Sequence, residues 1–457
     1  MALNTVVTAN ENVPPVTRTL AKFVATHPSK GWSDAVDHEA HRTFINWLGC
    51  GIGAANHLSV EAALAAVSEL QPAPQATVLG RSERVDIGSA AMLNGISSHT
   101  FDFDDTHLKT IIHPAGPVAS AVLALAEKTG ATGRELIDAL VLGIDVSCRI
   151  GNMIYPDHYD RGWHITGSTG MFGSAAACAR LLKLDDAQTT MALGIAASQP
   201  VGLREQFGTM TKPLHPGAAA RAGMMSALMA KRGFTSSERA IEAPRGFAQV
   251  ASTKFDWNEI TNELGQRFEI SFNTYKPFAC GIVIHPSIDG CVRLRNQHGL
   301  QPADIARVEL KVHGLVLELT GKRSPRNGLE GKFSVYHGCA AGLAFGMAGE
   351  AEYADDIVTR PDIVALRDKV VATVDNTMDE AAADVTITCT DGRKLHVLIE
   401  HAVGSVENPM TDALLEAKFD ALVTPVLGAA KGQAIKKLCW DLAAQPNVAE
   451  LMRQARP

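Results

Sequence analysis

The stretch Thr132-Gly-Arg-Glu135-Leu-Ile-Asp-Ala-Leu-Val-Leu-Gly-Ile-Asp-Val-Ser-Cys-Arg-Ile-Gly-Asn-Met-Ile154 decides the fold class of this chain. It opens with a capping box, in which the Thr132 hydroxyl and the Glu135 carboxylate satisfy free amide donors reciprocally at a helix start. Apolar residues then recur at helical spacing, which predicts a helix over 133–154. Its small residues allow close packing against neighbouring helices in a buried bundle.

The same pattern continues on both sides of this stretch, and it predicts a series of helices over about the first 270 residues. A second capping box, Thr235-Ser-Ser-Glu238, predicts another helix start after these segments. Gly, Pro and capping residues separate the apolar-periodic segments. The remaining predicted helices cover roughly 34–53, 60–70, 86–101, 114–129, 168–183, 187–198 and 214–231.

The pattern changes after about residue 270. The segment 306–313 alternates apolar and polar residues, as a half-exposed strand does. The runs 384–390 and 394–399 meet through Asp391-Gly392, which predicts a β-hairpin. We therefore expect a smaller α+β unit over about 271–404, and a helical tail over 412–450 that docks back on the large domain.

Composition sets broad limits on function. The chain has 457 residues, 46% hydrophobic and 20% charged, with a net charge of −7 and a pI near 6.1. The composition is typical of a soluble globular protein, without the basic field that attracts nucleic acid, and the length allows two domains or one large core with a smaller appended one. Residues 1–15 do not resemble a signal peptide, and the longest apolar runs, such as 115–126, are too short to span a bilayer. We expect a cytoplasmic protein with neither nucleic-acid nor membrane partners.

The eight cysteines form no C-x-x-C pair and no zinc-finger spacing with histidine. Most stand in apolar helical runs, which favours buried, reduced thiols.

The densest polar cluster is Asp102-Phe-Asp-Asp-Thr-His-Leu-Lys-Thr-Ile-Ile-His113-Pro114, between two predicted helices. Pro114 suits the first position of a helix, so His113 should project near a helix N-terminus, where free amides and the macrodipole favour anions. Similar arrangements recur further along the chain, at Lys212-Pro213, Lys276-Pro277 and His285-Pro286, and at His164 before another expected helix start. Such a set of His and Lys side chains suits the binding of several carboxylates, with a histidine left for proton transfer.

Other chemistries fit less well. Asp102, Asp104, Asp105 and His107 offer metal-binding atoms, but their spacing matches neither an EF-hand loop nor H-E-x-x-H, so we expect no metal. The series Gly167-x-x-Gly170 lacks the dinucleotide-binding spacing, and close helix packing explains it better. A serine hydrolase is not indicated, because no G-x-S-x-G occurs.

Taken together, these segments resemble the MmgE/PrpD family, which contains 2-methylcitrate dehydratases, cis-aconitate decarboxylases and iminodisuccinate epimerases. The matching pieces run in family order over nearly the whole chain. They are Asp102-Phe-Asp-Asp-Thr106 with His113-Pro114, Gly162-Trp-His164, Gly208-Thr-Met-Thr-Lys-Pro-Leu-His215, Lys276-Pro-Phe-Ala-Cys280 and Glu330-Gly-Lys-Phe-Ser334.

The resemblance implies a mainly α fold, with a large all-helical domain built from 1–270 and 405–457 and a smaller α+β lid over 271–404. It also implies a homodimer without a cofactor, and an active site in a cleft between the two domains. Carried over by motif, the catalytic residues are His113, His164, Lys212, Lys276 and Asp102. Thr106, Lys212, Lys276, His285 and Cys280 would bind substrate.

In this interpretation His113 moves the proton at the carbon next to a carboxylate. Lys212 and Lys276 clamp carboxylates and stabilise the charge that develops there. His164 is a second acid or a substrate ligand, and Asp102 orients His113 or Thr106.

The motifs leave the substrate open. The run His113-Pro-Ala-Gly-Pro117 lacks the Asp-Asn pair of the family's dehydratases and is closer to animal cis-aconitate decarboxylases. Phe207-Gly-Thr-Met-Thr-Lys-Pro213 is instead close to the epimerase version. We expect a cofactor-free lyase, a dehydratase or decarboxylase of a small di- or tricarboxylate. The alternatives are an epimerase of an amino dicarboxylate such as iminodisuccinate, and an inactive carboxylate-binding homologue.

Overall fold

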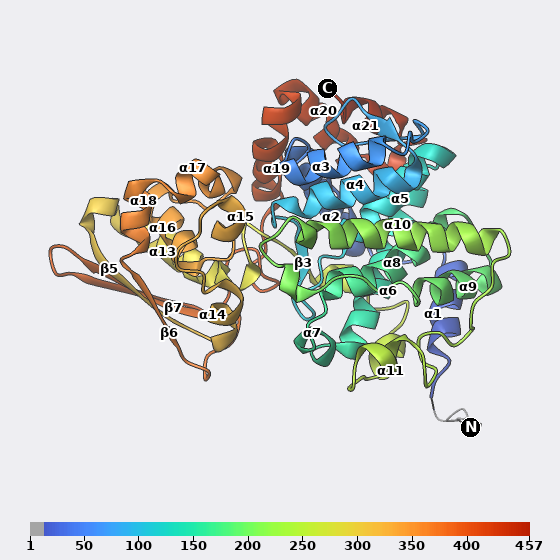
Figure 1. The fold of residues 1–457 in the computed structure, drawn as a ribbon, viewed down its shortest axis with the longest axis horizontal. Coiled ribbons are helices and arrows are strands. Elements are labelled where there is room, and N and C mark those ends of the chain that lie inside the picture. Colours follow the sequence, from blue (N-terminus) through green and yellow to red (C-terminus); the bar gives the residue numbers. More distant parts are fainter. Residues whose placement is uncertain (1–12) are drawn as a thin grey trace. The chain divides into compact units, whose positions relative to one another are not determined.

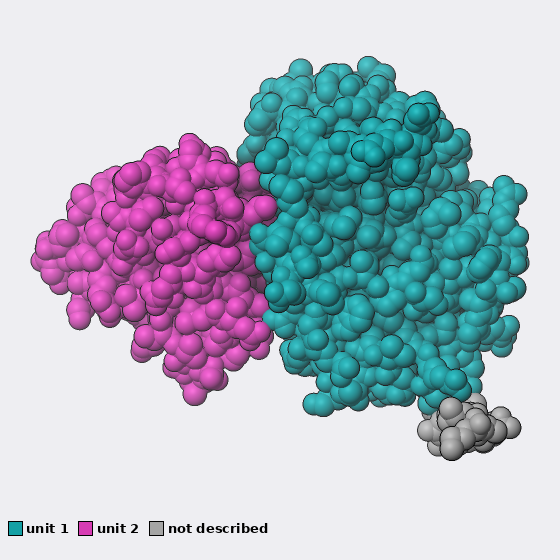
Figure 2. Space-filling view, in the orientation of Figure 1, with its two compact units in different colours: residues 1–100, 104–273, 415–457 teal, residues 101–103, 274–414 magenta. Residues whose placement is uncertain are grey.

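The computed structural model describes residues 13–457, which fold into two compact units. Unit 1 comprises residues up to 100, 104–273 and 415–457, and unit 2 comprises 101–103 and 274–414. Figures 1 and 2 show the elements and the residues that belong to each unit. The mainly helical fold class predicted from the sequence is confirmed.

Unit 1 is almost entirely helical, and its C-terminal helices come from the tail of the chain. Its long helices pack around α6 and α8, which lie side by side. The helices are α1 (Val16–Thr26), α2 (Asp34–Gly53), α3 (Leu58–Ser68), α4 (Ile87–Thr100), α5 (Ala115–Thr129), α6 (Gly133–Ile154), α7 (Asp157–Asp160), α8 (Ile165–Leu181), α9 (Asp186–Ala196), α10 (Thr211–Lys231), α11 (Phe247–Ala251), α12 (Asn258–Thr261), α19 (Asp412–Leu427), α20 (Ala429–Trp440) and α21 (Ala449–Gln454). The short strands are β1 (Ala76–Thr77), β2 (Arg84–Val85) and β3 (Asp105–His107).

Helix α6 is buried along nearly its whole length, as its apolar sequence predicts. Its predicted capping box is confirmed: Thr132 caps the Glu135 amide, and the Glu135 carboxylate accepts from the Thr132 amide. Two charged residues inside this helix, Asp145 and Arg149, are four apart and pair at 2.7 Å. Pairing is what makes two buried charges tolerable in an apolar core.

Glycines allow helix α4 to approach helix α10 closely. A Cβ added at Gly95 would lie 2.6 Å from the Gly217 Cα, inside van der Waals contact. Helices α6 and α8 meet in the same way, because a Cβ at Gly143 would lie 2.7 Å from the Gly173 carbonyl oxygen. The packing brings the end of α4 and the starts of α8 and α10 together, as the ring contacts described below show.

Unit 2 contains a four-stranded sheet with the order β6-β5-β7-β8. Strand β5 runs parallel to β6 and antiparallel to β7, and β7 and β8 form the predicted hairpin with Gly392 in a left-handed conformation. Helix α13 packs on β7 and β8, and α16 packs on α13. The strands are β5 (Ile305–Val312), β6 (Val370–Val374), β7 (Ala383–Cys389) and β8 (Lys394–Ile399), and β4 (Asn273–Tyr275) enters the unit. The helices are α13 (His285–His298), α14 (Gly314–Thr320), α15 (Gly328–Gly331), α16 (Val335–Phe345), α17 (Asp355–Val358) and α18 (Pro361–Arg367).

One predicted helix start is wrong. The segment 235–246 forms turns, and the next helix, α11, begins only at Phe247. The hydroxyl of Ser236 donates to the carbonyl of Met191, and the hydroxyl of Ser237 accepts from the Arg239 amide within a turn. The Ser236 hydroxyl therefore bonds the distant helix α9 and the Ser237 hydroxyl bonds a local turn, and neither caps a helix.

Two other helices begin three residues earlier than predicted, α8 at Ile165 and α10 at Thr211. Within residues 13–457 no single helix has the length and apolarity to cross a membrane, although the bent pair α2 and α3 meets those criteria together.

Candidate active site

His113 stands two residues before helix α5, at the start of the His113-Pro114 motif, and is buried. Its backbone N–H donates to the Thr166 hydroxyl at 3.1 Å. Its Nδ1 lies 2.7 Å from the Asp105 carbonyl oxygen and 3.3 Å from the Thr106 hydroxyl. A carbonyl oxygen only accepts, so Nδ1 carries the proton and Nε2 is the basic nitrogen of the neutral ring.

Asp104 is a fully buried carboxylate beside two histidines. Its Oδ2 lies 2.7 Å from Nδ1 of His99, and its Oδ1 lies 3.5 Å from Nδ1 of His113. The two imidazole rings meet edge to face, with centroids 4.8 Å apart. One carboxylate thus sits against two rings.

His164 is the N-cap residue of helix α8, and its ring joins the same group. The ring is stacked on His99, with centroids 5.6 Å apart, and its Nδ1 lies 2.8 Å from Nδ1 of His215. One of those two nitrogens donates to the other, so at least one of the rings is deprotonated at Nδ1. We call His99, Asp104, His113, His164 and His215 the histidine cluster.

Lys212 lies in the first turn of helix α10, next to the histidine cluster. Its Nζ lies 5.2 Å from the centroid of the Phe207 ring, and that ring is 5.1 Å from the ring of His164. Gly202 has a φ of 108°, and a Cβ there would lie 3.0 Å from the His215 ring and 3.2 Å from His164. The backbone can pass this close to the His215 ring and to the His164 Cβ only because the residue is glycine.

Burial and charge keep two of the four rings neutral. Burial lowers the pKa of His164 well below its usual value, and the charges of His99 and Lys212 lower it further. Burial, with the charges of His99 and Lys212, lowers the pKa of His215 to about 4. Neutral imidazoles beside a cationic Lys212 can accept protons or hydrogen bonds from an acidic ligand.

Asp105 holds the loop that carries His113. Its Oδ2 accepts from the Ala115 amide at 3.1 Å and from the Asn273 amide nitrogen at 2.8 Å. Burial, and then the neighbouring Asp104 charge, raise the pKa of Asp105 to about 7. Asp105 therefore acts as an anchor of this loop at the start of α5.

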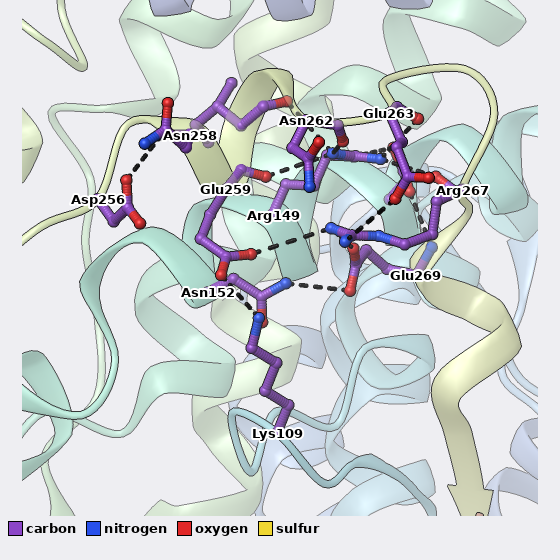
Figure 3. A network of polar contacts seen from close by, with 12 residues as sticks. Lys109, Arg149, Asn152, Asp256, Asn258, Glu259, Asn262, Glu263, Arg267 and Glu269 are labelled. Atoms are coloured by element: carbon purple, nitrogen blue, oxygen red, sulfur yellow. Dashed lines mark hydrogen bonds and ion pairs between the residues drawn. The ribbon is translucent and has the colours of Figure 1, made fainter.

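A second polar network lies at the other end of that loop, and Figure 3 shows its part around Arg149, Asn152 and Glu269. Nε2 of His107 lies 3.1 Å from a carboxylate oxygen of Glu269, which also accepts from Asn152 at 3.0 Å. The Arg149 guanidinium donates to backbone carbonyls of the segment 259–267, including that of Asn262 at 2.9 Å. Although burial alone would raise it, the pKa of Glu269 is lowered to about 2 by His107 and Arg267.

Unit 2 contains two further predicted site residues, Asp102 and Lys276, and they form an ion pair. The Lys276 ammonium donates to Asp102 Oδ1 at 2.6 Å and to the Asp102 carbonyl oxygen at 3.0 Å. Both side chains are buried. Asp102 has a φ of 51°, a left-handed conformation that costs energy for a residue with a side chain and often marks functional sites.

Lys332 and Glu350 form a second ion pair in unit 2, in which the lysine is buried and the carboxylate is partly exposed. The Lys332 ammonium donates to Glu350 at 2.5 Å, to the Ala279 carbonyl at 2.9 Å and to the Phe101 carbonyl at 2.7 Å. Burial raises the pKa of Glu350 even though Lys332 opposes the shift. Lys332 and Lys276 thus hold the short segment 101–103 within unit 2.

The other two predicted residues, Cys280 and His285, lie in unit 2 and are buried. Burial is the main cause that raises the pKa of the Cys280 thiol to about 12, so this thiol is protonated at neutral pH. The His285 ring begins helix α13 and packs edge to face on Phe278, with centroids 5.3 Å apart. Neither arrangement is typical of a nucleophile.

His99, Asp104 and His113 offer the one set of possible metal ligands within residues 13–457, with their ligand atoms within 4.8 Å of one another. The Nδ1 atoms of both histidines already make hydrogen bonds of 2.7 Å, to Asp104 and to the Asp105 carbonyl. We therefore assign these residues to a hydrogen-bonded cluster. The expectation of a metal-free site stays a prediction.

The structure thus places the sequence-predicted residues in two groups. His113, Thr106, His164 and Lys212 lie in unit 1, and Asp102, Lys276, Cys280 and His285 lie in unit 2. Sequence reasoning missed the roles of His99, His215, Lys332 and Glu350, and it considered Asp104 only as a metal ligand. His215 and Lys332 stand inside quoted motifs and could have been found there; His99 carried no signal beyond its place at a helix end.

Comparison with known proteins gives matches over most of the chain. The MmgE/PrpD N-terminal domain matches residues 18–260, and the MmgE/PrpD C-terminal domain matches residues 278–442. The cis-aconitate decarboxylase-like protein oryM of Aspergillus oryzae is 25% identical over 96% of both chains. The cis-aconitate decarboxylase of Aspergillus terreus is 26% identical over 85% of both. The 2-methylcitrate dehydratase of Salmonella typhimurium is 23% identical over 80% of this chain and 81% of its own.

Proposed function

The chain belongs to the MmgE/PrpD family and is an enzyme of the lyase type, and we propose that it decarboxylates a small unsaturated tricarboxylate of the cis-aconitate kind without a cofactor. The observation that carries this proposal is the histidine cluster next to Lys212, which combines an anion-binding cation with imidazoles for proton transfer. The named relatives with the highest coverage are a cis-aconitate decarboxylase and a protein similar to one.

The proposed reaction needs a place for the electron pair that is released. The bond between a carbon and its carboxylate breaks, carbon dioxide leaves, and the electron pair stays on the carbon beside a conjugated carboxylate. A proton then adds to that carbon, so substrate plus one proton gives product plus carbon dioxide. Cations near the remaining carboxylates stabilise the transient negative charge.

We assign the proton transfer to Nε2 of His113. The Nδ1–H bond to the Asp105 carbonyl fixes the ring and its tautomer, which is how a general acid–base histidine is usually oriented. As the imidazolium, the ring can deliver its Nε2 proton to the carbanion and regain it from water.

Substrate carboxylates would be bound by Lys212 and by His164, which stands at the N-terminus of helix α8. Free amides at a helix start and a nearby ammonium both favour anions. Within the proposal, Lys276, oriented by Asp102, serves the same reaction as a second cation, and Thr106, His285 and Cys280 remain proposed substrate contacts.

A dehydratase is the second candidate, favoured by the likeness to the Salmonella typhimurium 2-methylcitrate dehydratase. The same residues would remove a proton next to a carboxylate, and a hydroxide would leave with a second proton as water. The epimerase alternative uses the same proton abstraction, so one experiment must separate all three.

The protein is incubated with cis-aconitate, 2-methylcitrate and iminodisuccinate in heavy water. Carbon dioxide released from cis-aconitate supports the decarboxylase. A rise in ultraviolet absorbance with 2-methylcitrate supports the dehydratase, and deuterium uptake without a change in composition supports the epimerase. The absence of turnover and of deuterium uptake with all three would contradict the proposed function. The oligomeric state can be measured on the same sample, since a homodimer remains a proposal.

A further inference from the structure

His99 is the one ring of the histidine cluster that neither the motifs nor the proposed reaction uses. It lies in the last turn of helix α4 and is fully buried. Its Nδ1 bonds Asp104 at 2.7 Å, while its Nε2 has no hydrogen-bond partner among residues 13–457. The bond to Asp104 is therefore the polar contact that sets the angle of this ring.

The ring of His99 touches both proposed functional histidines. It meets His113 edge to face at a centroid distance of 4.8 Å and an interplanar angle of 66°, and it stacks on His164 at 5.6 Å and 30°. Rotation of this ring would clash with one neighbour or leave a gap at the other, because buried side chains are close-packed.

The Asp104 carboxylate contacts both His99 and His113. Its Oδ2 bonds His99, and its Oδ1 lies 3.5 Å from Nδ1 of His113. Because the carboxylate is fully buried, its position and charge depend on these neighbours.

We propose that His99, oriented by Asp104, is a positioning residue of the lyase reaction: it holds the rings of His113 and His164 in register for binding and proton transfer. This inference rests on the proposed function. The charge of His99 also acts on its neighbours. Burial is the main cause that lowers the pKa of His164 and that of His215, and the charge of His99 is the next cause for both. The charged or titratable groups that face this pair are Asp104 and Asp105 from the β3 segment, His113 before α5, and Lys212 from α10.

Two variants separate positioning from packing. His99→Asn keeps a donor near the place of Nδ1 and can still bond Asp104, whereas His99→Leu keeps apolar volume and loses the bond. We expect kcat to fall at least 30-fold in His99→Leu and less than 10-fold in His99→Asn, with KM changed less than threefold in both. A merely structural role predicts reduced stability with kcat unchanged per folded molecule, and that result would overturn the proposal.

A second measurement needs no turnover, so it stays informative if the proposed substrates fail. In ¹⁵N-histidine-labelled protein, the His215 signal, identified by its loss in His215→Asn, should titrate near pH 4. Its midpoint should rise by at least 0.5 pH unit in His99→Asn, because a neighbouring positive charge is gone. An unchanged midpoint would overturn the inference that the charge of His99 acts on His215. A shifted midpoint in a protein that is inactive on all three substrates would contradict the proposed function alone.

Discussion

The Nζ of Lys276 lies 2.6 Å from Oδ1 of Asp102 and 3.0 Å from the carbonyl oxygen of the same residue. One ammonium group therefore binds both the side chain and the backbone of a residue held at a φ of 51°. A buried pair of this kind gives little net stability, but the loss of one partner leaves an unpaired buried charge.

Replacing Lys276 with Met should lower the free energy of unfolding by about 3–5 kcal/mol, because the buried Asp102 carboxylate loses the ammonium group that binds it. The double variant Lys276→Met with Asp102→Asn should recover part of this loss. Urea denaturation measures both, with Lys109→Met as the control, since that lysine pairs at an exposed position. A single variant as stable as the wild type would contradict the expectation.

Replacing His113 with Asn should lower kcat by at least about 100-fold without unfolding the chain. The Asn amide can still donate to the Asp105 carbonyl, but it has no nitrogen that transfers a proton as Nε2 does. The matched control is His396→Asn on strand β8, whose ring is more than half exposed. Steady-state assays on the substrate that shows turnover decide the outcome, and an active His113→Asn variant would remove the assigned role.

The depressed pKa of His215 predicts a loss of stability in acid. The ring titrates near 6.5 in an unfolded chain and near 4 in the folded one. Above pH 6.5 neither state binds the proton; as the pH falls from 6.5 to 4, the unfolded state binds it first, so unfolding becomes easier by up to about 3 kcal/mol. His215→Asn should therefore show a flatter decline across this window in thermal or urea denaturation. Equal slopes in variant and wild type would argue against the shift.

The close approach of α4 and α10 should tolerate no added methyl group. Gly95→Ala places a Cβ 2.6 Å from the Gly217 Cα, and overpacking of this kind costs about 1–3 kcal/mol. Gly432→Ala in helix α20 is the control, because the nearest neighbour of its Cβ is 3.6 Å away and alanine is the better helix former. The melting temperature should drop for the first variant and hold or rise for the second; a neutral Gly95→Ala would show that the helices can move apart.

Arg149→Met should destabilise unit 1 by at least about 3 kcal/mol, because Asp145 and several backbone carbonyls lose the buried guanidinium that binds them. The exposed pair of Arg453 and Glu450 provides the contrast, and Arg453→Met should change stability by less than about 1 kcal/mol. Urea denaturation of both variants tests the difference. If the two lost equal stability, the network of Figure 3 would not be an anchor.

Local sequence signals identified much of the fold, because they describe neighbours along the chain. The Thr132 capping box and the Asp391-Gly392 turn each need only a few consecutive residues, and both predictions are confirmed. The capping box at Thr235 has the same signature, but the Ser236 hydroxyl bonds Met191 in helix α9 and the Ser237 hydroxyl bonds the Arg239 amide in a turn. The signature includes neither contact.

The residues of the candidate site also differ in how far the sequence could identify them. His113, His164 and Lys212 were found because each stands at a helix start, which sequence patterns mark. The bond between His99 and Asp104 joins the end of a helix to the following loop. Its proposed role depends on the rings of His113 and His164, which contact His99 through the tertiary structure. A buried histidine in an apolar helix has no sequence mark that separates it from a core residue.

Three residues of the chain, 101–103, belong to unit 2, while the residues on either side belong to unit 1. A fragment cut out as residues 274–414 would lack both the Asp102 carboxylate that Lys276 binds and the Phe101 carbonyl that Lys332 binds. Unit 2 therefore cannot be exchanged between relatives, or expressed separately, as one contiguous gene segment. A chimera of two family members would have to take residues 101–103 from the same parent as the two lysines that bind them, Lys276 and Lys332.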